Sequence, residues 1–349
     1  MRRKPDHEVS LIRRSFDFIP PAGFDPLTAS QDELAKFGIV PRPDRKSDPV
    51  SFRHWLRIFA PPMTFVAPKL REERAMFRLN TSAPKHHAAA AASASRYDTS
   101  RNWSGAYVVP TDDTMFVLVA GLWAIPDVAL PPPEFQQPGA TQYVCSTWVG
   151  LDGQRKYLNS SLPQAGTMQF LTLPNNGPPQ TTAIAFFEWW DQEDGGTFLQ
   201  LNGLPVHPGD VMLGAVWAKD KTTAIAYLRN LTTGTMAIVG ATAPIVTLSG
   251  NPPVELTISG ATAEWILERP TEPHTTTLHP FPAYSTTTFS CWAGAAATAG
   301  APQIWHDLKR ARFIRLFDTL PDPTRTAFIS MPDWRSDAAV RLEYGDFKD

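Results

Sequence analysis

The sequence predicts an all-β fold, an antiparallel β-sandwich preceded by a short and partly helical N-terminal arm. From residue 102 onward, short runs rich in Val, Ile, Phe, Trp and Thr recur between Pro, Gly and Asn residues, a pattern typical of strands and turns. No helical pattern of comparable length interrupts these runs, which favours an antiparallel sandwich over an alternating α/β sheet. The 34 prolines in 349 residues also favour loops and strand edges, because proline lacks the amide hydrogen that helices and ladders need.

The arm, residues 1–84, contains two predicted helices. The first covers residues 30–37, because a Ser-x-x-Glu capping box opens it and a glycine follows it. The second begins near Pro49 and ends before the proline pair at 61–62.

An Ala/Ser-rich linker, residues 85–100, separates the arm from the sandwich and is predicted to be flexible or cleavable. Residues 1–100 hold 17 basic and 11 acidic side chains, whereas residues 101–300 hold 7 and 15. The arm is therefore predicted to pair electrostatically with the sandwich as an inhibitory or folding segment of a zymogen. Acid would weaken this attraction by protonating carboxylates. Acidification would therefore set when the arm is released at the linker.

The sandwich is predicted to span residues 101–300, and residues 301–349 form a C-terminal extension that adds strands. The predicted strands of the sandwich cover residues 106–109, 115–124, 143–149, 168–173, 183–190, 211–218, 223–228, 255–267 and 285–292. Residues 230–234 are predicted to form a hairpin turn, and two further strands are predicted around 326–330 and 338–344.

Composition excludes several kinds of protein. No apolar run is long enough to span a membrane, and the basic residues of the arm alternate with acidic ones and prolines, so neither a membrane nor a nucleic acid is expected as partner. No secretory signal is visible at the N-terminus, and the sequence does not identify the compartment. Cys145 and Cys291 are too few for a disulfide scaffold; they either pair or stay as buried thiols.

Motifs of common hydrolases are missing. There is no Gly-x-Ser-x-Gly, His-Glu-x-x-His, phosphate-binding glycine loop, Asp-Thr-Gly or Asp-Ser-Gly. The histidine spacings do not form a metal site, so no metal or other cofactor is expected.

Polar residues on two predicted strands are candidates for chemistry. Alternation places Glu264 and Glu268 on one face of their strand, and Glu188 lies among four aromatic residues. A carboxylate on the inner face of a sheet is costly unless it has partners or a function. From this pattern alone, two interpretations stay open: exposed strand glutamates opposite basic neighbours, or functional carboxylates.

Seven short motifs occur along the chain, and their order and approximate spacing are informative. They are Asn102-Trp103-Ser104-Gly105-Ala106, Thr147-Trp148-Val149-Gly150-Leu151-Asp152-Gly153, Leu162-Pro163-Gln164-Ala165-Gly166, Phe187-Glu188-Trp189-Trp190, Asn230-Leu231-Thr232-Thr233-Gly234, Ala263-Glu264-Trp265-Ile266 and Pro280-Phe281-Pro282-Ala283-Tyr284. Over roughly residues 101–292, this series resembles the glutamic peptidase family, also called eqolisins.

The resemblance implies a sandwich of two large antiparallel sheets like a lectin jelly roll, and endopeptidase activity in acid without metal or cofactor. It implies that Gln164 and Glu264 are the catalytic residues. Trp103, Trp148, Asp152 and Glu188 match residues that the family places around that pair in the substrate cleft. Basic pro-segments of the family fit the arm.

Three features depart from the family pattern. Pro163 stands between Leu162 and Gln164, where the family reads Leu-Gln directly. Ile184 stands where the family has an aspartate, which weakens the hydrogen bonding expected around Glu188. The family's cysteines have no counterparts at Cys145 and Cys291.

The predicted mechanism uses Glu264 as general base toward water and Gln164 as hydrogen-bond donor to the oxyanion, with both side chains facing a solvent-filled cleft. The expected substrate is a protein or peptide, and the chain is expected to act as a monomer. Two alternatives stay open: a non-catalytic sandwich that binds carbohydrate or peptide, and a glycoside hydrolase using Glu188 and Glu264. The latter needs carboxyl groups about 5–5.5 Å or about 6.5–9.5 Å apart.

Overall fold

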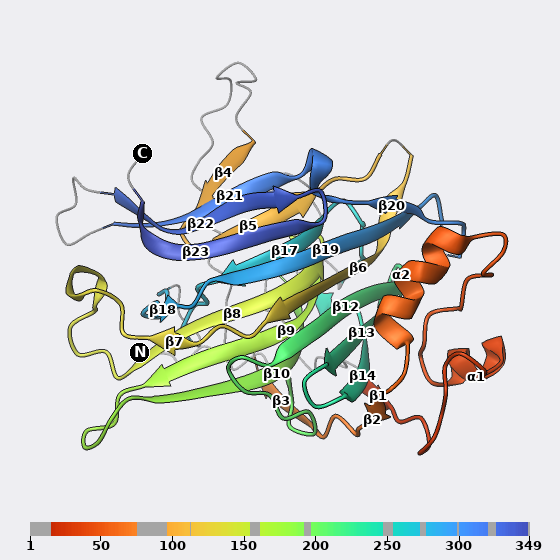
Figure 1. Cartoon of the computed structure of the whole chain (residues 1–349), viewed down its shortest axis with the longest axis horizontal. Coiled ribbons are helices and arrows are strands. Elements are labelled where there is room, and N and C mark those ends of the chain that lie inside the picture. Colours follow the sequence, from red (N-terminus) through yellow and green to blue (C-terminus); the bar gives the residue numbers. More distant parts are fainter. Residues whose placement is uncertain are drawn as a thin grey trace, which may run out of the picture.

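The computed structural model describes residues 15–74, 96–111, 113–153, 161–191, 197–246, 254–272, 277–298, 300–319 and 326–347. Two sheets pack face to face and are joined along one edge, where β21 pairs with β22 (Figure 1). The described pairings are antiparallel except for two, β2 with β14 and β4 with β21. The predicted β-sandwich is confirmed.

The first sheet carries all of the predicted catalytic residues. Its strands, in spatial order, are β4 (Tyr97–Ser100), β21 (Arg312–Thr319), β5 (Trp103–Val108), β17 (Ala263–Glu268), β8 (Gln142–Leu151), β9 (Ser161–Thr172), β10 (Gln180–Asp191), β11 (Thr197–Leu201) and β3 (Leu70–Arg74).

The second sheet packs behind it. Its strands, in order, are β22 (Thr326–Ser336), β23 (Ala339–Phe347), β19 (Thr287–Ala296), β6 (Met115–Ala124), β12 (Val211–Asp220), β13 (Thr223–Asn230) and β14 (Thr235–Thr242), followed by β1 (Ser15–Phe18) and β2 (Thr64–Phe65), which both pair with β14. A short strand, β20 (Ile304–His306), also pairs with β19. Two small sheets join β15 (Ile245–Val246) to β16 (Val254–Glu255), and β7 (Val128–Ala129) to β18 (Ala283–Tyr284). Two 3₁₀ turns cover Pro133–Phe135 and Leu308–Arg310.

The main core lies between the two sheets, because alternation along each strand sends every second side chain inward. Trp189 and Trp265 of the first sheet and Trp123 and Phe289 of the second belong to this core and are buried. Burying each such side chain contributes about 1.5–3 kcal/mol to stability. Cys145 and Cys291 also lie in this core as free thiols, which decides between the two states that the sequence left open.

Each predicted strand overlaps a strand of the structure, but the run 255–267 is split in two. Val254–Glu255 belongs to a small separate sheet, and the site strand β17 begins only at Ala263. The break comes from a turn at Gly260, whose backbone has a φ of +63°, a conformation that glycine adopts at little cost. The run is rich in residues that favour strands, so the sequence pattern did not reveal the turn.

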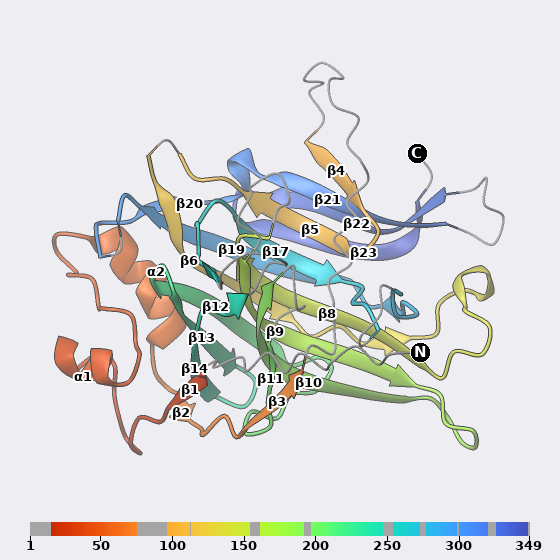
Figure 2. The ribbon, with the colours of Figure 1, turned by 180° about the vertical axis from the view of Figure 1, so that it is seen from behind.

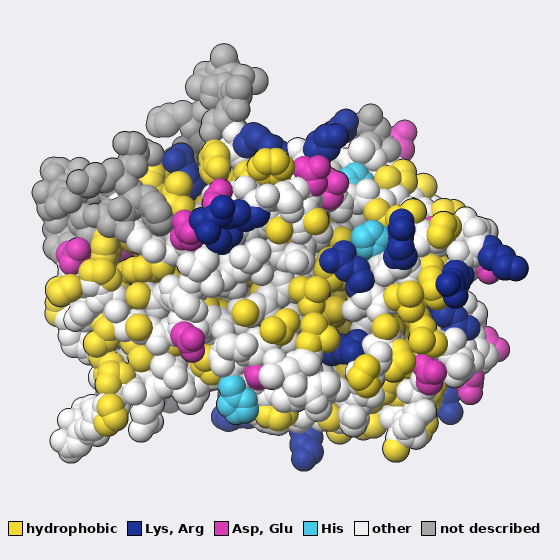
Figure 3. Space-filling model, in the orientation of Figure 1, with side chains coloured by type: hydrophobic (Ala, Val, Ile, Leu, Met, Phe, Trp, Pro, Cys, Tyr) yellow, Lys and Arg dark blue, Asp and Glu magenta, His cyan; other side chains and the backbone are white. Residues whose placement is uncertain are grey.

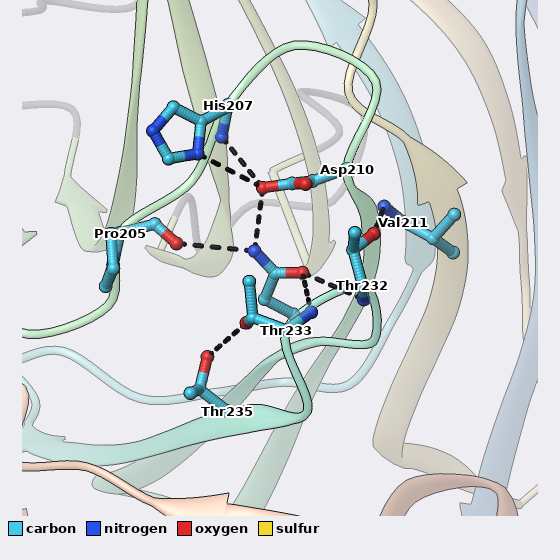
Figure 4. Close-up of polar contacts among 8 residues, drawn as sticks. Pro205, His207, Asp210, Val211, Thr232, Thr233 and Thr235 are labelled. Atoms are coloured by element: carbon cyan, nitrogen blue, oxygen red, sulfur yellow. Dashed lines mark hydrogen bonds and ion pairs between the residues drawn. The ribbon is translucent and has the colours of Figure 1, made fainter.

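The predicted hairpin turn connects β13 to β14, and the buried side chain of Asn230 holds it. Its Oδ1 accepts hydrogen bonds from the backbone N–H groups of Thr232 at 3.0 Å and Thr233 at 3.2 Å, and its Nδ2 donates to Asp210 at 2.8 Å. Figure 4 shows Asp210 also accepting from the backbone of His207. Asn230 therefore has a structural role, tying this turn to the loop before β12.

Both predicted arm helices are present. They are α1 (Gln31–Lys36), with the Ser30–Glu33 capping box, and α2 (Pro49–Phe59), capped by Asp48. No helix in the described part of the chain is long and apolar enough to cross a membrane.

The helical part of the arm covers the outer face of the second sheet, away from the predicted catalytic residues, whereas its strand β3 pairs with β11 at the edge of the first sheet. Trp55, Ile58 and Phe59 of α2 are buried in a cluster with residues of β12, β13 and β14, and both helices lie at the end of the molecule near these strands in Figures 1 and 2. Arg53 and Arg57 of α2 are exposed, and Figure 3 shows Lys and Arg side chains on this side of the molecule.

Two polar side chains of β13 reinforce this packing. The guanidinium of Arg229 donates to the carbonyls of Ile58 at 3.1 Å, Ala60 at 2.9 Å and Pro62 at 2.8 Å. The hydroxyl of Tyr227 donates to the Gly38 carbonyl at 2.6 Å. The arm is thus an integral layer of the fold, and the predicted linker lies outside the described residues apart from its end, where β4 begins.

Candidate active site

Three predicted polar residues lie on one row across the first sheet. Glu264 of β17 is opposite Gly150 of β8, Gly150 is opposite Gln164 of β9, and Gln164 is opposite Glu188 of β10. Residues directly opposite one another project from the same face of a sheet. We call these four residues the polar row.

The spacing of the row follows from strand geometry. Neighbouring strands lie about 4.8 Å apart, so the Cα atoms of Glu264 and Gln164 are roughly 10 Å apart and those of Glu264 and Glu188 roughly 14 Å. The two carboxylates are three strand spacings apart, and Gln164 stands between them with its amide bonded to Glu188, where a pair of glycosidase carboxylates would need room for the sugar and water. The geometry disfavours the glycoside hydrolase alternative.

Gly150 matters because it carries no side chain between Glu264 and Gln164. A Cβ at this position would lie 2.9 Å from Leu162 Cδ1, 3.1 Å from Trp148 Cζ3 and 3.2 Å from Gln164 Cβ. A larger residue would therefore push into the centre of the row. The sequence contained Gly150 in a motif but gave no reason to single it out.

The amide of Gln164 has a defined orientation. Its Nε2 donates to Glu188 Oε2 at 2.7 Å, while among the described residues its Oε1 has no hydrogen-bond partner. Pro163 does not disturb this arrangement, since β9 pairs regularly through Pro163 opposite Trp189 and Gln164 opposite Glu188. Ile184, at the position of the expected aspartate, packs against the apolar cluster of this face.

Glu264 is fully buried, with an exposed fraction of 0%, and Gln164 is exposed by only 1%. The expectation that both face a solvent-filled cleft is wrong for this conformation. The reason is that the outer face of the first sheet carries its own apolar cluster, to which Tyr107, Trp148 and Phe198 contribute. Thr262 donates its hydroxyl to Glu264 Oε1 at 3.0 Å, which offsets part of the cost of burying a carboxylate.

Trp103 and Trp148 lie beside the row and contact each other edge to face, with ring centroids 5.2 Å apart. The indole nitrogen of Trp148 donates to Glu268 Oε2 at 2.8 Å. Burial raises the pKa of Glu268 to about 7, although hydrogen bonds from Trp148 and its neighbours lower it. Glu268, which alternation placed on the same face as Glu264, thus holds Trp148 against the row.

Asp152 does not join the other polar residues. Its carboxylate accepts hydrogen bonds from the backbone N–H of Ser259 at 2.7 Å, the Ser259 hydroxyl at 2.8 Å and the backbone N–H of Ala261 at 2.8 Å. Burial raises the pKa of the Asp152 carboxyl, although these donors lower it. Asp152 therefore anchors the turn that leads into β17.

The chain is similar to known proteins over most of its length. A family model described as "Peptidase A4 family" matches residues 101–319 of the chain. No curated protein sequence matches the chain significantly.

Solved structures are similar over most of the sandwich. Scytalido-glutamic peptidase, crystallised with a transition state analog inhibitor, has 20% sequence identity and a TM-score of 0.51 over 70% of this chain and 98% of its own. SCP-B, described as a member of the eqolisin family, has 18% identity and a TM-score of 0.47 over 70% and 98%. Aspergilloglutamic peptidase from Aspergillus niger has 23% identity and a TM-score of 0.44 over 58% and 99%. The first of these similarities shows the shared sandwich fold.

Proposed function

The chain belongs to the peptidase A4 family, the glutamic peptidases, and from this premise we propose that Glu264 and Gln164 are the residues with which it hydrolyses peptide bonds in acid. Family membership makes the chain a glutamic-type endopeptidase whose substrates are proteins or peptides. The choice of residues, the acidic working range and the mechanism are our proposal.

The observation that carries the proposal is the polar row. A base and an amide donor stand on the same face of one sheet, with only Gly150 between them. Peptide hydrolysis needs an activated water and a donor aimed at the tetrahedral oxyanion. A substrate carbonyl seated over Gly150 would lie between the two groups that these steps require.

In this mechanism Glu264 removes a proton from water as the water attacks the scissile carbonyl carbon. Gln164 donates an N–H to the oxygen that becomes negative, and Glu264 then returns the proton to the leaving amine. A glutamate of ordinary pKa about 4.3 is still partly ionised in mild acid, where histidine bases are protonated. An amide does not titrate in this range, so Gln164 keeps its donor throughout.

Glu188 has a supporting role in the proposal. The Nε2 of Gln164 carries two hydrogens, and one of them is donated to Glu188. This bond fixes the plane of the amide, so the second hydrogen is held in one direction before substrate binds. Such preorganisation is what makes an oxyanion donor effective.

Trp103 and Trp148 are proposed as walls of the substrate site, because they flank the row and Trp148 packs beside Gly150. Asp152 is proposed to act on the site through the turn it anchors instead of touching substrate. We propose that the enzyme acts as a monomer. Residues 101–300 hold only 7 basic side chains, so neither a nucleic acid nor a membrane is proposed as its partner.

Digestion of a denatured protein by the full chain, from about pH 2 to about pH 7 with product masses recorded, tests this function. We expect cleavage in acid that is indifferent to metal chelators, serine and thiol reagents, and pepstatin. Strong inhibition by a chelator would contradict the mechanism. A complete absence of products at every pH would favour the non-catalytic binding module.

A further inference from the structure

We propose that Thr262 is a positioning residue for Glu264, and that Asp152 fixes Thr262 in place by anchoring the turn before β17. The inference rests on the proposed function, since it assumes that Glu264 is the general base. It assigns Asp152 a different role from that of a residue lining the cleft.

The contact between Thr262 and Glu264 is direct. The Thr262 hydroxyl donates to Glu264 Oε1 at 3.0 Å, and both residues have an exposed fraction of 0%. Two residues apart in extended chain, they project to the same side. A hydroxyl has a single hydrogen to give, and Thr262 gives it to Glu264, so this bond fixes the position of one carboxylate oxygen of the base.

Thr262 is itself held from two sides. The backbone N–H of Asp152 donates to the Thr262 carbonyl at 3.0 Å. The Asp152 carboxylate binds Ser259 and Ala261, the residues that lead up to Thr262, through three hydrogen bonds of 2.7–2.8 Å.

The same turn is tied to the second sheet. The backbone N–H of Phe116 in β6 donates to the Gly260 carbonyl at 2.8 Å, and a Cβ on Gly260 would lie 2.5 Å from the Phe116 carbonyl oxygen. The turn is therefore held by hydrogen bonds to Asp152, after β8 of the first sheet, and to Phe116 in β6 of the second sheet. A base whose position must be accurate to about 1 Å needs such support, because a misplacement of that size can cost roughly 10²-fold in rate.

The test compares Thr262→Val, which removes the hydroxyl while keeping the shape, with Thr262→Ser, which keeps the hydroxyl. For Thr262→Val we expect kcat to fall about 10- to 100-fold with KM changed less than about twofold, because the contact acts on the reacting group. Loss of the donor also disfavours the ionised carboxylate, so the acidic limb of the pH–rate profile should move to higher pH. Thr262→Ser should keep most of the wild-type kcat and leave the acidic limb close to its wild-type pH.

Among the described residues, the other titratable groups on this face are Tyr107 on β5 with Asp98 on β4 and Arg312 on β21, which bond one another, Glu188 on β10, Glu268 on β17 and Asp152 after β8. All are unchanged in the two Thr262 variants, so a shift of the limb reports the hydroxyl. Thr167→Val is the matched control. Thr167 is buried in the same sheet and its hydroxyl bonds that of Thr147 at 2.9 Å on the core side, so this variant should lower the melting temperature and leave kcat and the limb unchanged.

Asp152→Asn tests the second part. Asparagine tolerates the φ of +70° at this position but loses the charge and one acceptor. If Asp152 acts through Thr262, the double variant Asp152→Asn/Thr262→Val should lose little more activity than Thr262→Val alone. Fully additive losses would overturn this part.

A normal kcat and pH profile in folded Thr262→Val would overturn the first part. Glu264→Gln, assayed beside it, separates the two ideas. If that variant is inactive while Thr262→Val is normal, only this inference fails. If Glu264→Gln keeps full turnover, the proposed function fails with it.

Discussion

Gln164 donates its amide hydrogen to Glu188 across the β9–β10 ladder, with 2.7 Å between Nε2 and Oε2. Both side chains are buried, and Glu188 is exposed by only 4%. The acceptor is held on the neighbouring strand, so this contact sets which way the Gln164 amide points.

Glu188→Ala should therefore damage catalysis without touching the base. Freed from its acceptor, the Gln164 amide loses its fixed direction, and we expect kcat to fall roughly 10²-fold, close to the loss of an oxyanion donor. Glu188→Gln can still accept from Gln164 through its own amide oxygen, so it should lose far less. Steady-state kinetics of both variants decide the matter; equal losses would mean that charge, and not orientation, is what Glu188 supplies.

Glu268→Gln should remove a pH dependence of stability. The folded state holds a proton on Glu268 with a pKa of about 7, whereas the ordinary value is 4.5, so folding binds the proton more tightly than the unfolded chain does. Stability therefore rises as pH falls from about 7 to about 4.5, by roughly 3 kcal/mol. A glutamine is neutral at every pH and can still accept from Trp148.

Denaturant unfolding of the wild type and Glu268→Gln at pH 8 and pH 4 measures this. We expect the variant to be the more stable protein at pH 8 and similar at pH 4, with turnover at pH 4 near that of the wild type. If the wild type and Glu268→Gln change in stability by the same amount between pH 8 and pH 4, folding does not raise the pKa of Glu268 and the prediction is wrong.

The arm should stay bound after the linker is cut. The apolar residues of α2 are buried on the second sheet, and Arg229 makes three hydrogen bonds to the arm backbone. Loss of these contacts would expose the outer face of that sheet, so release in acid is not expected. The experiment places a specific protease site between residues 85 and 95, cuts it, and follows both fragments by size-exclusion chromatography at pH 4.

We expect the two fragments to elute together with full activity. Trp55→Ala, which removes a side chain exposed by only 2%, should cost roughly 3–5 kcal/mol and loosen the complex. Val50→Ala, on the same helix but 41% exposed, should not. An arm that leaves an intact and active sandwich would instead support the zymogen predicted from charge.

Local features were predictable because they depend on near neighbours in sequence. The capping box predicted α1. The alternation of side chains predicted that Glu264 and Glu268 lie on one face of their strand, and runs of strand-forming residues predicted the strands. The register between strands was not predictable, since it joins residues as distant as Gly150 and Glu264. For the same reason the sequence did not reveal that Asp152 reaches the turn at Ser259, or that α2 covers the second sheet and not the site.

The most direct test of the account is the turnover of Glu264→Gln on an unfolded protein at acidic pH, with Gln164→Ala beside it and thermal melts of both. Loss of a general base costs roughly 10²–10⁴ in rate, and loss of one oxyanion donor roughly 10²–10³. We expect losses of these sizes in kcat, with folding retained, since a buried carboxylate replaced by a neutral amide of the same shape does not lose a favourable charge. Normal turnover by a folded Glu264→Gln would contradict the assignment of Glu264 as the base, and with it the mechanism proposed for this enzyme.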